Sequence, residues 1–153
     1  MTGSVERQVV AERVYDHPVA AVWPFLRRYG ALAQWHPWAA ASVMEDDAPE
    51  DRIGAVRIVT GRPKPNVARE RLLGLSDAAW WIDYNVEAGL PVENYRARAQ
   101  LWPLGAERKR LLWRASFHAR PDRADRWQAN FQRIYADGLQ AIADWLAAGR
   151  TLA

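Results

Sequence analysis

Apolar residues recur along this chain with two different periods, and the change between the periods predicts its architecture. Residues 6–15 alternate imperfectly and indicate a first strand. Residues 16–30 then carry apolar side chains at helical spacing, with Asp16 as a candidate N-cap and Gly30 as the expected end. Residues 31–37 are expected to form a second, shorter turn of helix.

From residue 40 onward the apolar period becomes two, which is typical of strands with one buried face. Short segments rich in Gly, Pro, Asp and Ser separate these runs, and spacers this short join antiparallel neighbours. A final helical pattern begins at Asp122 or Asp125, ends at Gly149 and has one broad apolar face. The six predicted strands are 40–45, 54–60, 68–75, 80–86, 93–102 and 110–119.

This order of elements predicts a single α+β domain over residues 1–153. A curved antiparallel sheet of about seven strands, with one polar face, has to bury its other face. The C-terminal helix is the one element long enough to cover it. The two short helices fall between the first and second strands.

The alternation also predicts which residues face the helix. Val56 and Ile58 are expected to point inward, with Arg57 between them pointing outward. Other inward positions mix large rings with small residues such as Ala97 and Ala115. Small residues there leave room for a ligand, unless the tryptophan side chains fill the space.

The inward face carries one misfit, the carboxylate Glu70. Burying a carboxylate is costly unless it is paired or hydrogen-bonded. Either this residue lies at an edge of the sheet, or it faces a cavity that holds water. In the second case His36, Tyr84 and Tyr95 are its candidate partners.

The opposite face of the sheet collects arginines, among them Arg96, Arg98 and Arg114. We interpret it as a solvated convex face with cross-strand pairs to acids such as Asp83. A nucleic-acid or anionic-membrane surface is the alternative, but no stacking aromatics are interleaved there. We therefore expect no nucleic-acid partner and no membrane insertion; an interaction role for this face is a minor third hypothesis.

The stretch LAQWHPWAA places His36 between Trp35 and Trp38, next to Pro37. Proline keeps this segment out of a regular helix, so the imidazole sits at a turn with apolar surface on both sides. In a cavity wall, His36 would offer a donor, or a charge near neutral pH, to an acidic or carbonyl-bearing ligand. In a packed corner it would bond to the backbone instead.

The amino-acid composition limits the kinds of site that the chain can form. The chain has no cysteine, and its three histidines are far apart, so we expect no metal and no cofactor. No 18-residue apolar run is present, and the N-terminus carries charges where a signal peptide is apolar. A cytoplasmic protein is expected. Nine tryptophans indicate either a bulky core or an aromatic-lined hollow.

Several motifs together resemble a known family: W-H-P, then GAVR, RERLLGLSD, LPVENY and LLWRASF. The chain resembles the SRPBCC, or START-related helix-grip, superfamily over nearly its whole length. Within that group it is similar to a bacterial branch of polyketide cyclase/dehydrase-like proteins. The resemblance implies a helix-grip fold with a deep cavity between the sheet and the long helix.

The same motifs are similar to those of plant abscisic-acid receptors. By position, His36 stands where those receptors keep a lysine for the hormone carboxylate, and Glu70 and Tyr95 match polar pocket residues. Residues 61–66 and 88–95 lie where the receptors have their gate and latch loops.

The chain departs from the receptors at several of these positions. The resemblance places Ala97, Ala115 and Gly138 where the receptors keep a serine, a glutamate and an asparagine, and the gate loop is shorter. These departures argue against the hormone as the ligand. The resemblance still implies a pocket in which His36 and Glu70 are the polar residues that contact the ligand.

We expect a binding protein for a small hydrophobic molecule: a lipid, an isoprenoid or an aromatic polyketide-like compound. The alternative is a polyketide cyclase/dehydratase-like enzyme with His36 or Glu70 as general base and Tyr84 or Tyr95 as oxyanion donor. The protein is expected to be a monomer or a homodimer. The predicted ligand-binding residues are Trp35, His36, Trp38, Val56, Ile58, Glu70, Leu72, Tyr84, Val86, Leu90, Pro91, Tyr95, Ala97, Trp113, Ala115, Phe117, Ile134 and Gly138.

Overall fold

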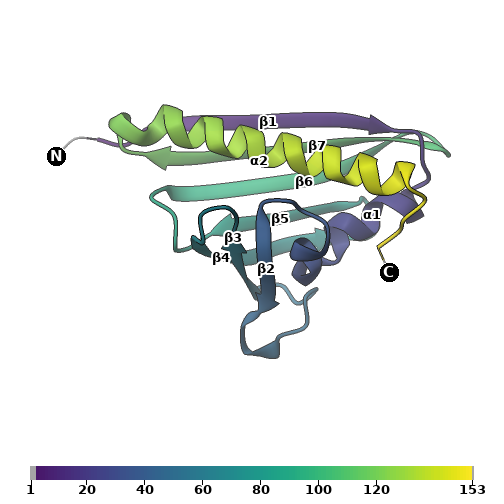
Figure 1. Cartoon of the computed structure of the whole chain (residues 1–153), viewed down its shortest axis with the longest axis horizontal. Coiled ribbons are helices and arrows are strands. Elements are labelled where there is room, and N and C mark those ends of the chain that lie inside the picture. The colour runs from purple at the N-terminus through teal and green to yellow at the C-terminus, as the bar shows by residue number, and fades with distance from the viewer. Residues whose placement is uncertain (1–2, 153) are drawn as a thin grey trace.

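The computed structural model describes residues 3–152 and confirms the α+β helix-grip fold. A seven-stranded antiparallel sheet has the order β1-β7-β6-β5-β4-β3-β2, and the long helix α2 lies along it (Figure 1). The helices are α1 (Val19–Arg27), η1 (Tyr29–Gln34), η2 (Glu45–Asp47) and α2 (Pro121–Ala147). The strands are β1 (Val5–Tyr15), β2 (Ala39–Met44), β3 (Val56–Gly61), β4 (Val67–Ser76), β5 (Trp81–Val86), β6 (Glu93–Gly105) and β7 (Arg108–Ala119).

The first helix differs in detail from the expectation. Asp16 does not cap it; the carboxylate pairs with Arg108 at 3.2 Å, and Pro18 occupies the N-cap position. The helix ends at Arg27, because the chain tightens there into the 3-10 helix η1, which contains Gly30. Pro24 lies inside the helix, and its carbonyl accepts the Arg28 N–H at 3.0 Å where the helix ends.

Hydrogen bonds to the edge strand β1 fix the position of α2. The Tyr15 hydroxyl donates to the Leu139 carbonyl at 2.7 Å. The side-chain amide of Gln128 donates to the Gln8 carbonyl at 2.7 Å, which satisfies one backbone group at the sheet edge. One side of α2 is thereby tied to β1, and another side faces the concave surface of the sheet.

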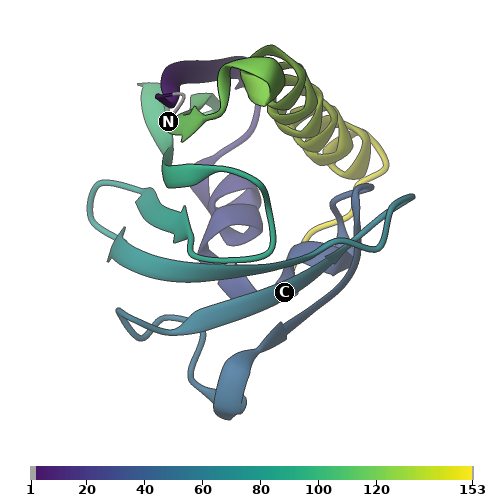
Figure 2. The same cartoon turned by 90° about the vertical axis from the view of Figure 1, so that its left-hand side faces the viewer.

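The sheet curls strongly, so that β2, β3 and β4 turn toward α2 from the side opposite β1 (Figure 2). The space near α1 is solidly packed. Phe25 contacts Trp35 and Trp145 edge to face, with ring centroids 5.5 and 5.7 Å apart. The hollow part of the fold therefore lies toward the N-terminal half of α2. Within residues 3–152, no helix is long and apolar enough to cross a membrane.

The predicted alternation is confirmed in β7, where every second residue from Lys109 to Ala119 is buried. In β3 it is wrong. Arg57 pairs with Glu70 and therefore points inward with it, whereas Ile58 pairs with Arg69 on the outer face. The alternation of β3 alone was ambiguous, since both of its faces carry apolar residues.

The convex face holds the cross-strand pair expected at Asp83. Arg98 donates to both carboxylate oxygens of Asp83, at 2.6 and 2.8 Å. The Arg98 guanidinium also covers the Trp81 ring, 4.2 Å from its centroid. Arginines on this face thus support the sheet.

Candidate functional site

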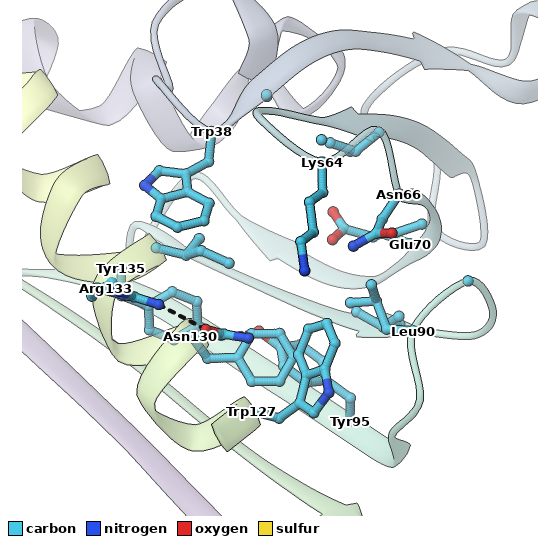
Figure 3. A pocket seen from close by; sticks show the side chains of 18 of the residues that line it. Trp38, Lys64, Asn66, Glu70, Leu90, Tyr95, Trp127, Asn130, Arg133 and Tyr135 are labelled. Carbon is cyan, nitrogen blue, oxygen red and sulfur yellow. Dashed lines mark hydrogen bonds between the residues drawn. The ribbon is translucent and has the colours of Figure 1, made fainter. Parts of the chain in front are cut away.

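A cavity of about 980 Å³ lies between the N-terminal half of α2 and strands β3, β4 and β5. Two loops border its mouth: the β3–β4 loop (residues 62–66) and the β5–β6 loop (residues 87–92). Figure 3 shows Lys64 reaching from the first loop into the space, with Trp127 and Asn130 of α2 on the opposite side. Ligand pockets typically enclose about 300–1,000 Å³, so this cavity is large enough for a lipid or a polycyclic molecule.

Ten of the eighteen residues predicted to bind a ligand line this cavity. They come from the W-H-P turn, the sheet, the β5–β6 loop and α2. These residues are His36, Trp38, Glu70, Tyr84, Val86, Leu90, Pro91, Tyr95, Trp113 and Ile134.

Eight predicted residues do not line the cavity. Val56 and Ile58 lie on the other face of β3, and Trp35 packs against Phe25 on the α1 side. The other five are covered by neighbouring side chains. They are Leu72, Ala97, Ala115, Phe117 and Gly138.

Aromatic rings fill the middle of the space between sheet and helix. Trp113 stacks on Tyr135 with centroids 4.6 Å apart, and Phe131 packs against Tyr95 and Phe117 at 5.0 and 5.1 Å. The small residues of the sheet accommodate these rings, so they do not enlarge the cavity. What remains hollow is the end nearer the two loops, with the rings as its floor.

Gly138 is small because His36 lies against it. A Cβ atom on Gly138 would lie 2.8 Å from His36 Nε2 and 3.2 Å from Trp113 Cζ3. Neither approach is sterically acceptable without movement of a ring. The glycine therefore makes room for a protein side chain, and the expectation that it makes room for a ligand is wrong.

Both nitrogens of the His36 ring are bonded to backbone. Nε2 donates to the Ile134 carbonyl at 2.9 Å, and Nδ1 accepts from the Trp38 N–H at 3.1 Å. Burial lowers the pKa of His36 to about 4, although the Ile134 carbonyl works in the opposite direction. The imidazole is thus neutral at pH 7 and clamps the W-H-P turn to α2. The expectation of a charge near neutral pH is wrong.

The partner of Glu70 is Arg57, although the alternation of β3 predicts that Arg57 faces outward. Arg57 Nε donates to Glu70 Oε1 at 2.6 Å, and Nη1 donates to the Tyr29 carbonyl at 3.1 Å. The guanidinium lies between the rings of Tyr29 and Tyr84, 4.0 and 5.0 Å from their centroids. The side chains of Arg57 and Glu70 are only 5% and 13% exposed.

The groups around the buried Arg57 guanidinium keep it charged. Burial is the largest single effect on the pKa of Arg57 and lowers it, but attraction to Glu70, together with the contributions of Tyr29 and Tyr84, raises the pKa above its ordinary value. The pair adds a fixed dipole to the inner wall, beside aromatic and aliphatic side chains. It is the main polar feature inside the cavity.

Tyrosine hydroxyls form a second polar group on the same wall. Trp113 Nε1 donates to the Tyr84 hydroxyl at 3.0 Å, and the hydroxyls of Tyr95 and Tyr135 are hydrogen-bonded to each other. Burial raises the pKa of both Tyr84 and Tyr95, so these phenols stay protonated. They offer hydrogen bonds to a ligand carbonyl or hydroxyl without adding charge.

The β5–β6 loop is fixed against β4 by close backbone contact. Gly89 has a φ of +98°, and a Cβ atom there would lie 1.8 Å from the Val67 carbonyl oxygen. Arg69 N–H donates to the Ala88 carbonyl at 3.0 Å, and Glu87 N–H donates back to the Arg69 carbonyl at 2.8 Å. One border of the mouth therefore has a defined position.

Five basic side chains line the outer part of the cavity, and none of them was predicted as a site residue. Their signal in the sequence was weak, because arginine is common throughout the chain. Among the described residues, no three His, Asp or Glu side chains gather as metal ligands would. The five are Arg62, Lys64, Arg123, Arg126 and Arg133.

Residues 6–146 match the family described as "Polyketide cyclase / dehydrase and lipid transport". The chain belongs to this family. The predicted resemblance to the SRPBCC group is therefore confirmed. Among curated proteins, none matches this chain.

Solved structures with this fold include proteins of different activities. The aromatase/cyclase ZhuI from Streptomyces sp. R1128 has a TM-score of 0.77 and 20% identity, with 90% of this chain and 92% of that chain covered. A protein from Thermobifida fusca has a TM-score of 0.76 and 25% identity, with coverage of 89% and 90%.

Norcoclaurine synthase from Thalictrum flavum, solved with dopamine and hydroxybenzaldehyde, has a TM-score of 0.74 and 15% identity, with coverage of 97% and 91%. The fold thus occurs in enzymes, and the family description also includes lipid transport, so the site itself has to distinguish catalysis from binding.

Proposed function

We propose that this protein binds a small, largely apolar molecule, such as a lipid, an isoprenoid or an aromatic polyketide-like compound, in the cavity under α2. One observation carries the proposal: a cavity of about 980 Å³ with an aromatic floor and a single buried ion pair, Arg57–Glu70. An apolar wall with few fixed polar groups is typical of sites that bind such molecules. The lipid-transport members of the family point in the same direction.

Binding is favoured over catalysis by the state of His36. A general base needs a free lone pair within reach of the substrate, and both nitrogens of this ring are engaged by backbone. Glu70 is the remaining candidate base, and one of its oxygens accepts the Arg57 Nε–H at 2.6 Å. The side chains at the centre of the site thus hold one another in place.

Co-purification tests the proposal. Protein purified without detergent is extracted with organic solvent, and the extract is analysed by mass spectrometry. We expect one apolar compound at near-stoichiometric amount. Ala68 lines the cavity, so Ala68→Phe fills it and should abolish retention. Ala41→Phe makes the same change at an exposed position of β2 and should leave retention intact. Equal retention by both variants would refute binding in this cavity.

A cyclase- or dehydratase-like activity is the second candidate, because Glu70 and the phenols of Tyr84 and Tyr95 line the same wall. A carboxylate and neutral donors are the groups that enolisation of a ketone requires. Deuterium exchange beside the carbonyl of 2-tetralone, followed by NMR in D₂O, measures that step. Exchange that wild type accelerates and Glu70→Gln does not would favour catalysis.

A further inference from the structure

The basic side chains at the mouth of the cavity differ from the other arginines of the fold. On the rest of the surface, arginines are commonly paired with acids; Arg69 with Glu45 at 2.7 Å and Arg110 with Glu12 are examples. Of the charged side chains that line the cavity, only Arg57 and Glu70 form an ion pair within residues 3–152. The cations of the mouth have no such partner.

These cations come from two elements that face each other across the mouth. Arg62 and Lys64 belong to the β3–β4 loop, and Arg123, Arg126 and Arg133 belong to α2. Figure 3 shows the Lys64 ammonium group directed across the opening toward α2. A small anion in the opening would therefore be approached from both sides.

The acidic residues of α2 near the mouth do not form ion pairs with these five cations within residues 3–152. On α2, Asp122 pairs with Arg120 at 3.2 Å, and Asp125 pairs with Arg7 at 3.0 Å. Asp137 accepts the Trp38 indole N–H at 2.7 Å. Asp122 and Asp125 are thus paired elsewhere, and in the described part of the chain Asp137 forms no ion pair with the cations of the mouth. Five like charges around one opening repel one another, and a ligand anion would relieve that repulsion.

We propose that the ligand is an amphiphilic acid, whose apolar body occupies the cavity and whose carboxylate, sulfonate or phosphate lies at the mouth between Lys64 and the arginines of α2. This inference rests on the proposed function, because it names the chemical class of the molecule bound there. It also assigns the binding of the acid to the cations of the β3–β4 loop and α2 instead of His36, which is neutral and buried.

Two fluorescent probes separate the two claims. N-phenyl-1-naphthylamine is neutral, and 8-anilinonaphthalene-1-sulfonate has the same ring skeleton with one sulfonate. We expect both to bind wild type, the sulfonate about tenfold more tightly at 20 mM NaCl. At 500 mM NaCl screening should remove most of that difference, because the interacting charges are exposed.

Matched charge variants locate the effect. The double variant Lys64→Gln/Arg126→Gln removes two cations of the mouth, and Arg96→Gln/Arg114→Gln removes two exposed cations of the convex face. We expect only the mouth variant to lose the preference for the sulfonate, while the neutral probe binds all three proteins equally. Thermal melting checks that each variant is folded.

The outcomes distinguish the two proposals. Equal affinity of wild type for both probes, or equal loss in the two double variants, would overturn the amphiphilic acid and leave the apolar cavity intact. If neither probe binds wild type, the proposed function itself fails. Sulfonate preference lost in the mouth variant alone would support the inference.

Discussion

Gly138→Ala tests the contact between α2 and the W-H-P turn. The added methyl group would lie 2.8 Å from His36 Nε2 and 2.9 Å from His36 Cδ2, so the ring has to move. Overpacking of this kind costs about 1–3 kcal/mol. Movement of the ring also weakens its 2.9 Å bond to the Ile134 carbonyl, at a cost of about 1 kcal/mol.

Helix propensity acts in the opposite direction, because alanine is more favourable than glycine in a helix by about 1 kcal/mol. The net expectation is a loss of about 1–3 kcal/mol in the free energy of unfolding, the sum of the three contributions. Each kcal/mol lowers Tm by about 2–4 °C in a domain of this size. Urea unfolding followed by tryptophan fluorescence measures the change directly.

A double-mutant cycle assigns the loss to the ring. In a His36→Ala background the imidazole is gone, and Gly138→Ala should then be neutral or stabilising by up to about 1 kcal/mol. If Gly138→Ala leaves wild type unchanged or more stable, the steric argument fails. If it costs the same in both backgrounds, the clash is with Trp113 or another neighbour, and the role assigned to His36 is wrong.

Three further predictions concern the cavity wall and its borders. Glu70→Gln leaves the Arg57 charge buried without a counter-charge and should cost about 3–5 kcal/mol in urea unfolding, whereas Glu45→Gln, in the partly exposed pair with Arg69, should cost much less. An alanine at position 89 cannot keep a φ of +98° next to the Val67 carbonyl of β4, so Gly89→Ala should lower Tm and weaken the binding of N-phenyl-1-naphthylamine. Unchanged binding of the probe would show that this loop is not part of the binding site. Because the pKa of His36 falls from 6.5 to about 4 on folding, the unfolded chain binds a proton between these values that the folded chain does not. Stability should therefore fall by about 3 kcal/mol between pH 7 and pH 4 through this residue, and urea titrations of His36→Gln should lack that share of the loss.

The alternation of polar and apolar residues was enough to predict the sheet because each strand buries one face. In β5 and β7 the inward residues are strongly apolar, so a shift by one residue would expose a row of large side chains. The long apolar face of α2 had one surface to cover. The cavity between sheet and helix was predicted from the family resemblance, through motifs such as W-H-P.

The register of β3 illustrates the limit of that pattern. Considered one strand at a time, the pattern made Glu70 a misfit on the inward face and placed Arg57 on the outward face. Across two antiparallel strands they are direct partners, and each offsets part of the cost of burying the other. Only the pairing of the strands shows this, because the sequence pattern of one strand contains no information about the residue opposite.

Side-chain packing set the other limit. The small residues Gly138 and Ala115 left two possibilities open, a space for a ligand or a space filled by aromatic side chains, and the rings of His36, Trp113 and Tyr135 occupy the middle of the fold. The volume of a cavity depends on rotamers, which alternation does not determine. The cations of the mouth were missed for a different reason, since their significance lies in having no acidic partner within the described chain.

NMR of methyl-labelled protein during titration with N-phenyl-1-naphthylamine tests the central claim most directly, because it reports where an apolar molecule binds. The cavity is lined by Val59, Val86 and Ile134, whereas Leu111 and Ile142 lie in the solid core. We predict that the methyl signals of the first three residues shift to saturation at one equivalent, and that those of the last two do not. Shifts confined to exposed methyl groups elsewhere, or no shifts at all, would contradict a ligand-binding cavity under α2.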